Sequence, residues 1–297
     1  MAHPDRRAAV PARSGGATLA ILYVFLWASA FVPSKILATE AQPLWMLVFR
    51  FFAAALILSA LAVAMRRRLP TTAAAWFEPA LLGALANACY LGLNYLALEH
   101  LSSGMGAIIA SLNPLILALL APRLLDEPLT ARKALGTALG FAGVVAMMVT
   151  RAGTQAARPI DVALAIAGTV ALVLSTIVFK RIQSRHDLLV INAAQLASAS
   201  ALLIPAAAML EGPLRLVVTR GLVASFAYLV LVISVGASLL WFTLLARGEA
   251  SRVSAYYFLT PVFGLALGAM LLAEHVSLRD VTGLAMITCG IALVQRS

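Results

Sequence analysis

Long apolar runs separated by short polar breaks fill almost the whole chain. A helix needs roughly 20 predominantly apolar residues to cross a bilayer, and ten of the runs are long enough. The breaks carry turn or charged residues, for example Gln42-Pro43 and Asp126-Glu127-Pro128. We therefore predict ten transmembrane helices, over about residues 17–37, 43–65, 79–98, 103–122, 134–151, 161–181, 187–210, 221–246, 252–272 and 278–295.

The composition indicates lipid as the solvent. Of the 297 residues, 62% are hydrophobic and 11% are charged, whereas about 25% of the residues in a soluble domain are charged. An open sheet edge leaves backbone groups unpaired in lipid, so strands are not expected. We predict an all-α membrane protein with the lipid bilayer as a partner.

The net charge of +10 raises the alternative of a nucleic-acid-binding protein. However, the basic residues form short groups between apolar runs, as the positive-inside rule describes, and do not gather on one face. This distribution argues against nucleic acid as a partner and places both termini in the cytoplasm. With that orientation, the outside holds only Lys35, Arg151, Arg158, Arg215, Arg220 and Arg279.

Residues with metal, redox or catalytic chemistry are few and scattered. Cys89 and Cys289 each lie inside an apolar run, so a disulfide framework is not expected. No HExxH or GxSxG pattern is present, and we expect neither a cofactor nor a metal. The four histidines, His3, His100, His186 and His275, are scattered, so a metal or catalytic site built on histidine is not expected. A membrane-embedded enzyme and a membrane scaffold or receptor subunit are kept as alternative functions.

The N-terminus resembles a signal peptide, because arginines precede an apolar run that reaches Ala28-Ser29-Ala30. Against cleavage, the apolar run continues through Phe31 and Val32, and cutting it would remove part of an internal repeat. We interpret this segment as an uncleaved first helix.

That repeat relates the two halves of the chain. Shifting residues 251–294 back by 147 positions aligns Pro, Gly and charged residues that shared hydrophobicity does not explain. The aligned pairs are Pro114 with Pro261, Glu127 with Glu274, Arg132 with Arg279, Gly136 with Gly283, and Gly143 with Gly290.

Each half holds five helices, so the second half must enter the membrane in the opposite orientation. Inverted repeats are a recurring transporter device, since two similar halves can exchange conformations around a central cavity. We predict four segments: a cytoplasmic tail over residues 1–16, a five-helix repeat over 17–151, a periplasmic connection over 152–160, and a second five-helix repeat over 161–297.

Several repeated residues are expected to be structural. The glycines at helical positions allow close approach of backbones. Glu127 and Glu274 should lie on opposite sides of the membrane and anchor helix ends. Ser277 and Asp280 resemble a capping box. Asn192 and Gln195 share one face of the seventh helix and are expected to hydrogen-bond between helices.

These patterns resemble the drug/metabolite transporter superfamily, in its ten-helix EamA-type branch. The resemblance covers nearly the whole chain and rests on the run Leu26–Val32, on Arg50-Phe51, and on the repeated frame at Pro114–Gly143 and Pro261–Gly290. It implies an exporter of small metabolites in the bacterial inner membrane. Within the branch, amino-acid exporters, including exporters of aromatic amino acids, are the nearest match.

Polar side chains inside membrane helices are costly, so each one suggests either function or helix packing. Arg50 is a candidate to attract a substrate carboxylate, with a structural pair to Glu99 or snorkelling to the interface as the alternatives. Asn87, Tyr90 and Asn94 share one helix face. Amide and phenol groups on one face suit a zwitterionic or aromatic substrate, and helix–helix hydrogen bonding is the alternative.

Prolines in the fourth and ninth helices predict bends near the midplane, beside polar and aromatic residues. The predicted hinge residues are Pro114 and Pro261. The predicted substrate-binding residues are Trp27, Ser29, Arg50, Asn87, Tyr90, Asn94, Ser111, Asn113, Ser175, Ser238, Trp241, Tyr256, Tyr257 and Thr260.

All twelve carboxylates fall in breaks or near helix ends, so a proton carrier in the middle of the membrane is not expected. We predict alternating access with facilitated diffusion of a small-molecule substrate, and keep proton antiport of drugs or other metabolites as the alternative. A monomer is the working expectation, with the oligomeric state left open.

Overall fold

The computed structural model describes residues 14–98, 100–101, 103–149, 158–272 and 277–297. Every regular element in these residues is helical, and together they cross the molecule ten times. The first five crossings are α1 (Ser14–Ser29) with α2 (Phe31–Glu40); α3 (Pro43–Ala64); α4 (Ala73–Gly83), η1 (Ala84–Cys89) and α5 (Tyr90–Leu98); α6 (Ser103–Ala110) with α7 (Leu112–Leu124); and α8 (Ala131–Met148). The second five are α9 (Pro159–Ile182); α10 (Leu188–Glu211); α11 (Arg220–Tyr228), η3 (Leu229–Ala237) and α12 (Ser238–Arg247); α13 (Ala250–Ala255), η4 (Tyr256–Leu259) and α14 (Thr260–Leu272); and α15 (Leu278–Gln295).

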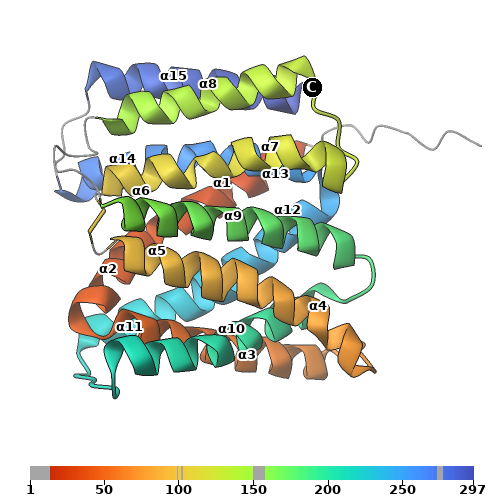
Figure 1. The fold of residues 1–297 in the computed structure, drawn as a ribbon, viewed down its shortest axis with the longest axis vertical. Coiled ribbons are helices and arrows are strands. Elements are labelled where there is room, and N and C mark those ends of the chain that lie inside the picture. The colour runs from red at the N-terminus through yellow and green to blue at the C-terminus, as the bar shows by residue number, and fades with distance from the viewer. Residues whose placement is uncertain (1–13, 99, 102, 150–157, 273–276) are drawn as a thin grey trace, which may run out of the picture.

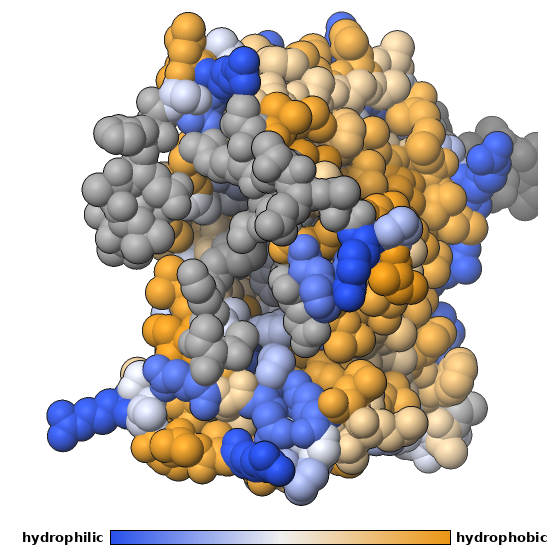
Figure 2. Space-filling model, turned by 60° about the vertical axis from the view of Figure 1, so that its left-hand side comes forward, coloured by the Kyte–Doolittle hydropathy of each residue, from blue (hydrophilic) through white to orange (hydrophobic). Residues whose placement is uncertain are grey.

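The flanks of the bundle suit a bilayer. Among the described residues, 8 helical crossings are long and apolar enough to span it, and the other two are α8 and the crossing α13–η4–α14. Large apolar side chains such as Phe77, Leu135 and Met209 point outward. Figure 2 shows this apolar flank in orange, with hydrophilic residues gathered toward the ends. Exposed apolar area of this extent matches a lipid environment.

The two repeats interlock. The crossings lie side by side in Figure 1, and the helix pairs that pack most extensively join one repeat to the other: α8 with α15, α3 with α10, α5 with α9, and α4 with α10. Because the number of crossings is even, the chain returns to the end where α1 began. We call this the C-terminal end and the other the opposite end.

Helices α8 and α15 show the inverted symmetry in atomic detail. Both have 18 residues and are separated by the predicted offset, and their N-caps are Thr130 and Ser277, the latter in a full capping box with Asp280. The predicted capping box is therefore confirmed.

The glycines of α8 and α15 contact each other in pairs that the two-fold symmetry relates. A Cβ atom on Gly136 would lie 2.6 Å from the carbonyl oxygen of Gly290, and one on Gly143 would lie 2.7 Å from that of Gly283. Gly136 corresponds to Gly283, and Gly143 to Gly290, so each contact is the image of the other. The prediction of a ten-helix fold made of two inverted five-helix repeats is confirmed.

Several helices are irregular at matching places in the two repeats. The π-helical segments η1 and η3 begin at Ala84 and Leu229, in the third helix of each repeat. Pro114 and Pro261 each follow an interruption, at Ser111 and at the 3-10 segment η4. Proline is tolerated at the start of a helix, where no intrahelical partner is lost. Both predicted hinge prolines therefore lie in the first turn of a new helical segment.

Candidate substrate site

Four aromatic side chains from both repeats meet inside the bundle, and we call them the aromatic cluster: Tyr23 and Trp27 of α1, Trp241 of α12 and Tyr257 of η4. Tyr23 stacks on Trp241 with ring centroids 4.9 Å apart, and Trp241 lies 4.9 Å from Tyr257. The hydroxyls of Tyr23 and Tyr257 are 2.7 Å apart. Trp27 stacks on Tyr23 at 6.1 Å. Offset and tilted ring pairs of this kind form a platform for an apolar or aromatic group.

The aromatic cluster lies in the half of the bundle nearer the C-terminal end. Tyr23 is 2% exposed and Trp241 is 8% exposed. Tyr90 is the first residue of α5 and directly follows the π-helical segment η1. Tyr23 was absent from the predicted site, although its spacing of four from Trp27 places both on one helix face.

A chain of polar side chains also joins the two repeats. Asn87 in η1 donates to Gln195 at 3.2 Å, and Gln195 donates to Asn192 at 2.6 Å. The Ser238 hydroxyl donates to the same Asn192 oxygen at 2.5 Å. The expected interhelical hydrogen bonding of Asn192 and Gln195 is therefore present, and it links Asn87 to Ser238.

The eighth crossing orders these features along the bundle. Ser234, Ser238 and Trp241 are spaced by four and three, so they follow one face from the opposite end toward the C-terminal end. Ser234 accepts from Arg50 Nε at 2.8 Å, Ser238 belongs to the polar chain, and Trp241 belongs to the aromatic cluster. The seven residues from Ser234 to Trp241 span about 10 Å of helix. The Arg50 guanidinium, bound to Ser234, and the aromatic cluster are therefore about 10 Å apart along the axis of the eighth crossing.

Other predicted residues are buried beside the helix interruptions. Among the described residues, neither side-chain polar atom of Asn113 has a hydrogen-bond partner, and the Thr260 hydroxyl has none. Asn113 is 2% exposed. Unbonded buried amides are costly, which makes these two residues candidates to face a substrate. Ser29 instead donates to the Leu26 carbonyl and lies 2.6 Å from the Tyr228 hydroxyl.

Three predicted residues use their polar groups within their own helices, and a fourth, Tyr256, packs in the apolar core. Ser111, Ser175 and Asn94 donate to the backbone of their own helices, at Ala107, Leu172 and Tyr90 respectively. Tyr256 is half-buried and packs against two apolar clusters, one of which contains Tyr23 and Trp241. The three polar side chains therefore lie outside the polar chain, whereas Tyr256 packs against the same apolar core as the aromatic cluster.

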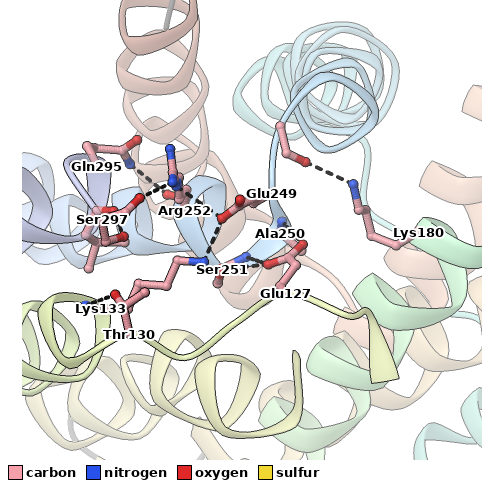
Figure 3. A network of polar contacts seen from close by, with 12 residues as sticks. Glu127, Thr130, Lys133, Lys180, Glu249, Ala250, Ser251, Arg252, Gln295 and Ser297 are labelled. Carbon is pink, nitrogen blue, oxygen red and sulfur yellow. Dashed lines mark hydrogen bonds and ion pairs between the residues drawn. The ribbon is translucent and has the colours of Figure 1, made fainter. Parts of the chain in front are cut away.

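A polar network closes the C-terminal end, as Figure 3 shows. Glu127 accepts from the amides of Ala250 and Ser251 at 2.6 and 3.0 Å, and from the Ser251 hydroxyl at 2.6 Å. Lys133 pairs with Glu249 at 2.6 Å, although its own side chain is only 3% exposed. Glu127 thus caps α13 of the second repeat. The related Glu274 lies outside the described residues.

The fold of two interlocking inverted repeats is that of a membrane transporter, and the candidate site lies between the repeats. The chain belongs to the EamA-like transporter family, which matches residues 14–149 and again residues 160–296.

Individual relatives agree with this assignment. The uncharacterized transporter YvbV of Bacillus subtilis is 29% identical over 281 residues, which cover 94% of this chain and 90% of that protein. A probable amino-acid metabolite efflux pump of Escherichia coli is 24% identical over 281 residues, covering 92% of each chain. One crystal structure shares the fold with a TM-score of 0.80 at 20% identity, covering 96% of this chain and 97% of that one.

Proposed function

We propose that this transporter exports small metabolites, and amino acids including aromatic ones in particular, across the bacterial inner membrane by alternating access. The aromatic cluster carries the proposal, because both repeats contribute rings to it beside the helix interruptions. The similarity to a probable amino-acid metabolite efflux pump supports the substrate class. We further propose that Asn87, Tyr90, Asn113, Ser238 and Thr260 line the path.

Facilitated diffusion is the proposed driving mode. The residues of the aromatic cluster and the polar chain are neutral, and the carboxylates of Glu127 and Glu211 lie at helix ends, where they cap α13 and α3. The excess of Lys and Arg toward the C-terminal end supports a cytoplasmic location for both termini. We propose a monomer as the transporting unit, since each chain contains both repeats.

A reconstituted transport assay tests the proposal. Proteoliposomes loaded with radiolabelled phenylalanine should release it faster than protein-free liposomes, and unlabelled amino acids should compete more strongly than cationic drugs. Release should not require a pH gradient. Proton-dependent transport of drugs without amino-acid flux would favour antiport, and hydrolytic activity without flux would contradict a transporter.

Replacing Trp27 by Ala tests the ring platform. Trp27 is the half-buried edge of the aromatic cluster, so its loss removes a stacking surface and leaves the buried rings in place. The half-saturation concentration for phenylalanine should rise about two- to tenfold, the effect of one aromatic contact. Alanine, which has no ring, should be affected less. Trp76→Ala is the matched control, since Trp76 is 39% exposed on α4; equal losses in both variants would contradict the platform.

A further inference from the structure

Arg50 is a buried cation in the half of the bundle nearer the opposite end. It is 5% exposed and lies seven residues along α3 from Pro43. It donates from Nε to Ser234 in η3 at 2.8 Å, and its guanidinium lies over the Phe51 ring at 5.6 Å. Among the described residues, no carboxylate lies within ion-pair distance of Arg50; Glu99, an alternative partner, is outside them. The guanidinium is therefore buried and does not snorkel to the interface.

The corresponding residue of the second repeat shows what this position requires. Gln195 lies 145 residues after Arg50, the separation that also relates η1 to η3. Arg50 bonds to η3, and Gln195 bonds to Asn87 of η1, so each residue links its helix to the π-helical segment of the other repeat. A neutral amide is sufficient for that link. The structural role of this position therefore does not require the charge of Arg50.

Burying an uncompensated guanidinium is expensive, and the planar fork of arginine is suited to carboxylates. Of its five N–H donors, one is used by Ser234. Arg50 is also one wall of a narrow cleft, together with Leu37, Pro43, Met46, Leu47, Tyr95 and Leu229.

That cleft adjoins a larger space at the opposite end. Pro43 and Tyr95 also line a cavity of about 180 Å³ that reaches Leu210 and Glu211. The Glu211 carboxylate in this wall is occupied by the first turn of α3, accepting from the amides of Leu44 and Trp45 at 2.8 and 3.1 Å. The cavity therefore ends at Pro43 and Tyr95, and the cleft between it and Arg50 is too narrow for a water molecule in this structure.

We propose that Arg50 is the carboxylate subsite of this transporter, and that the protein selects solutes with a carboxylate over the corresponding amides, amines and cationic drugs. As a statement about transported solutes this rests on the proposed function. As a statement about binding it stands on the burial of Arg50, its bond to Ser234 and the comparison with Gln195. A bound carboxylate takes the free N–H donors of the fork, and the apolar part of the solute extends toward the aromatic cluster.

Arg50→Gln is the direct test, because it gives the first repeat the glutamine that the second repeat has at the corresponding position, Gln195. The full chain in detergent is titrated with phenylacetate and with phenylacetamide, and binding is read from the rise in unfolding temperature. The wild type should bind the acid about ten- to a hundredfold more tightly than the amide, the range expected for charge-assisted hydrogen bonds. Arg50→Gln should bind both with equal affinity, and Arg50→Lys should keep part of the preference.

Two further variants separate charge from structure. Ser234→Ala removes the present partner of Arg50 and keeps the cation, so the preference for the acid should persist. Glu99→Gln should also keep it. The proposal is overturned if the wild type does not distinguish acid from amide, if Arg50→Gln keeps the wild-type ratio, or if Ser234→Ala or Glu99→Gln abolishes it. Because the readout is binding, these outcomes are independent of whether liposomes release phenylalanine.

Discussion

Gly290→Val is expected to prevent α8 and α15 from packing. A Cβ atom at this position would lie 2.5 Å from the Gly136 carbonyl oxygen and 2.6 Å from the Gly140 amide nitrogen. Both contacts are with helix backbone, so no rotamer change can relieve them, and the helices must separate. Overpacking of this kind costs about 3 kcal/mol. The yield of monodisperse protein in size-exclusion chromatography should fall sharply, and the surviving protein should unfold at a lower temperature.

The inverted symmetry supplies a second variant and a control. Gly143→Val meets the Gly283 carbonyl oxygen at 2.7 Å, so it should be as damaging as Gly290→Val. A Cβ atom on Gly264 of α14 would have no neighbouring atom within 4 Å, so Gly264→Val should fold normally. If Gly290→Val unfolds at the same temperature as Gly264→Val, the packing of the two helices does not depend on these glycines.

The periodic features of the fold could be predicted from the sequence. Ten apolar runs correspond to ten crossings, because the bilayer fixes the length and polarity of a spanning helix. The repeated frame predicted the relation between α8 and α15, since glycine, proline and cap residues mark backbone positions that other residues do not tolerate. The Ser277–Asp280 capping box is local and could be identified from four residues.

The pairing of side chains could not be predicted in the same way. Ser234 and Tyr228 are ordinary members of an apolar run, and they become partners of Arg50 and Ser29 only through helix packing. The π-helical segments η1 and η3 have no proline to mark them, although they change which residues of the third and eighth crossings face inward. Sequence spacing therefore predicts Ser111, Ser175 and Asn94 in the site. In the structure their side chains donate hydrogen bonds to the backbone of their own helices.

Glu127→Ala is expected to loosen α13 of the second repeat at the C-terminal end of the bundle. Glu127 is 7% exposed, and its two oxygens accept three hydrogen bonds from the start of α13. The amides at a helix start have no partner in their own helix, so removing the cap leaves Ala250 and Ser251 unsatisfied in a buried place. Loss of a cap together with a buried unsatisfied donor costs about 3 kcal/mol.

Hydrogen exchange locates this loss as well as measuring it. In Glu127→Ala the amides of Ala250 and Ser251 should exchange faster, while those of α8 and α15 keep their protection, and the unfolding temperature should fall. Asp126→Asn is the matched control. It removes the neighbouring carboxylate, and asparagine accepts the positive φ of 56° at this position. Because Glu127, in the connection between α7 and α8, caps a helix of the second repeat, faster exchange confined to α13 would show that this cap holds the start of α13 in place. Unchanged exchange at both amides would contradict this role of Glu127.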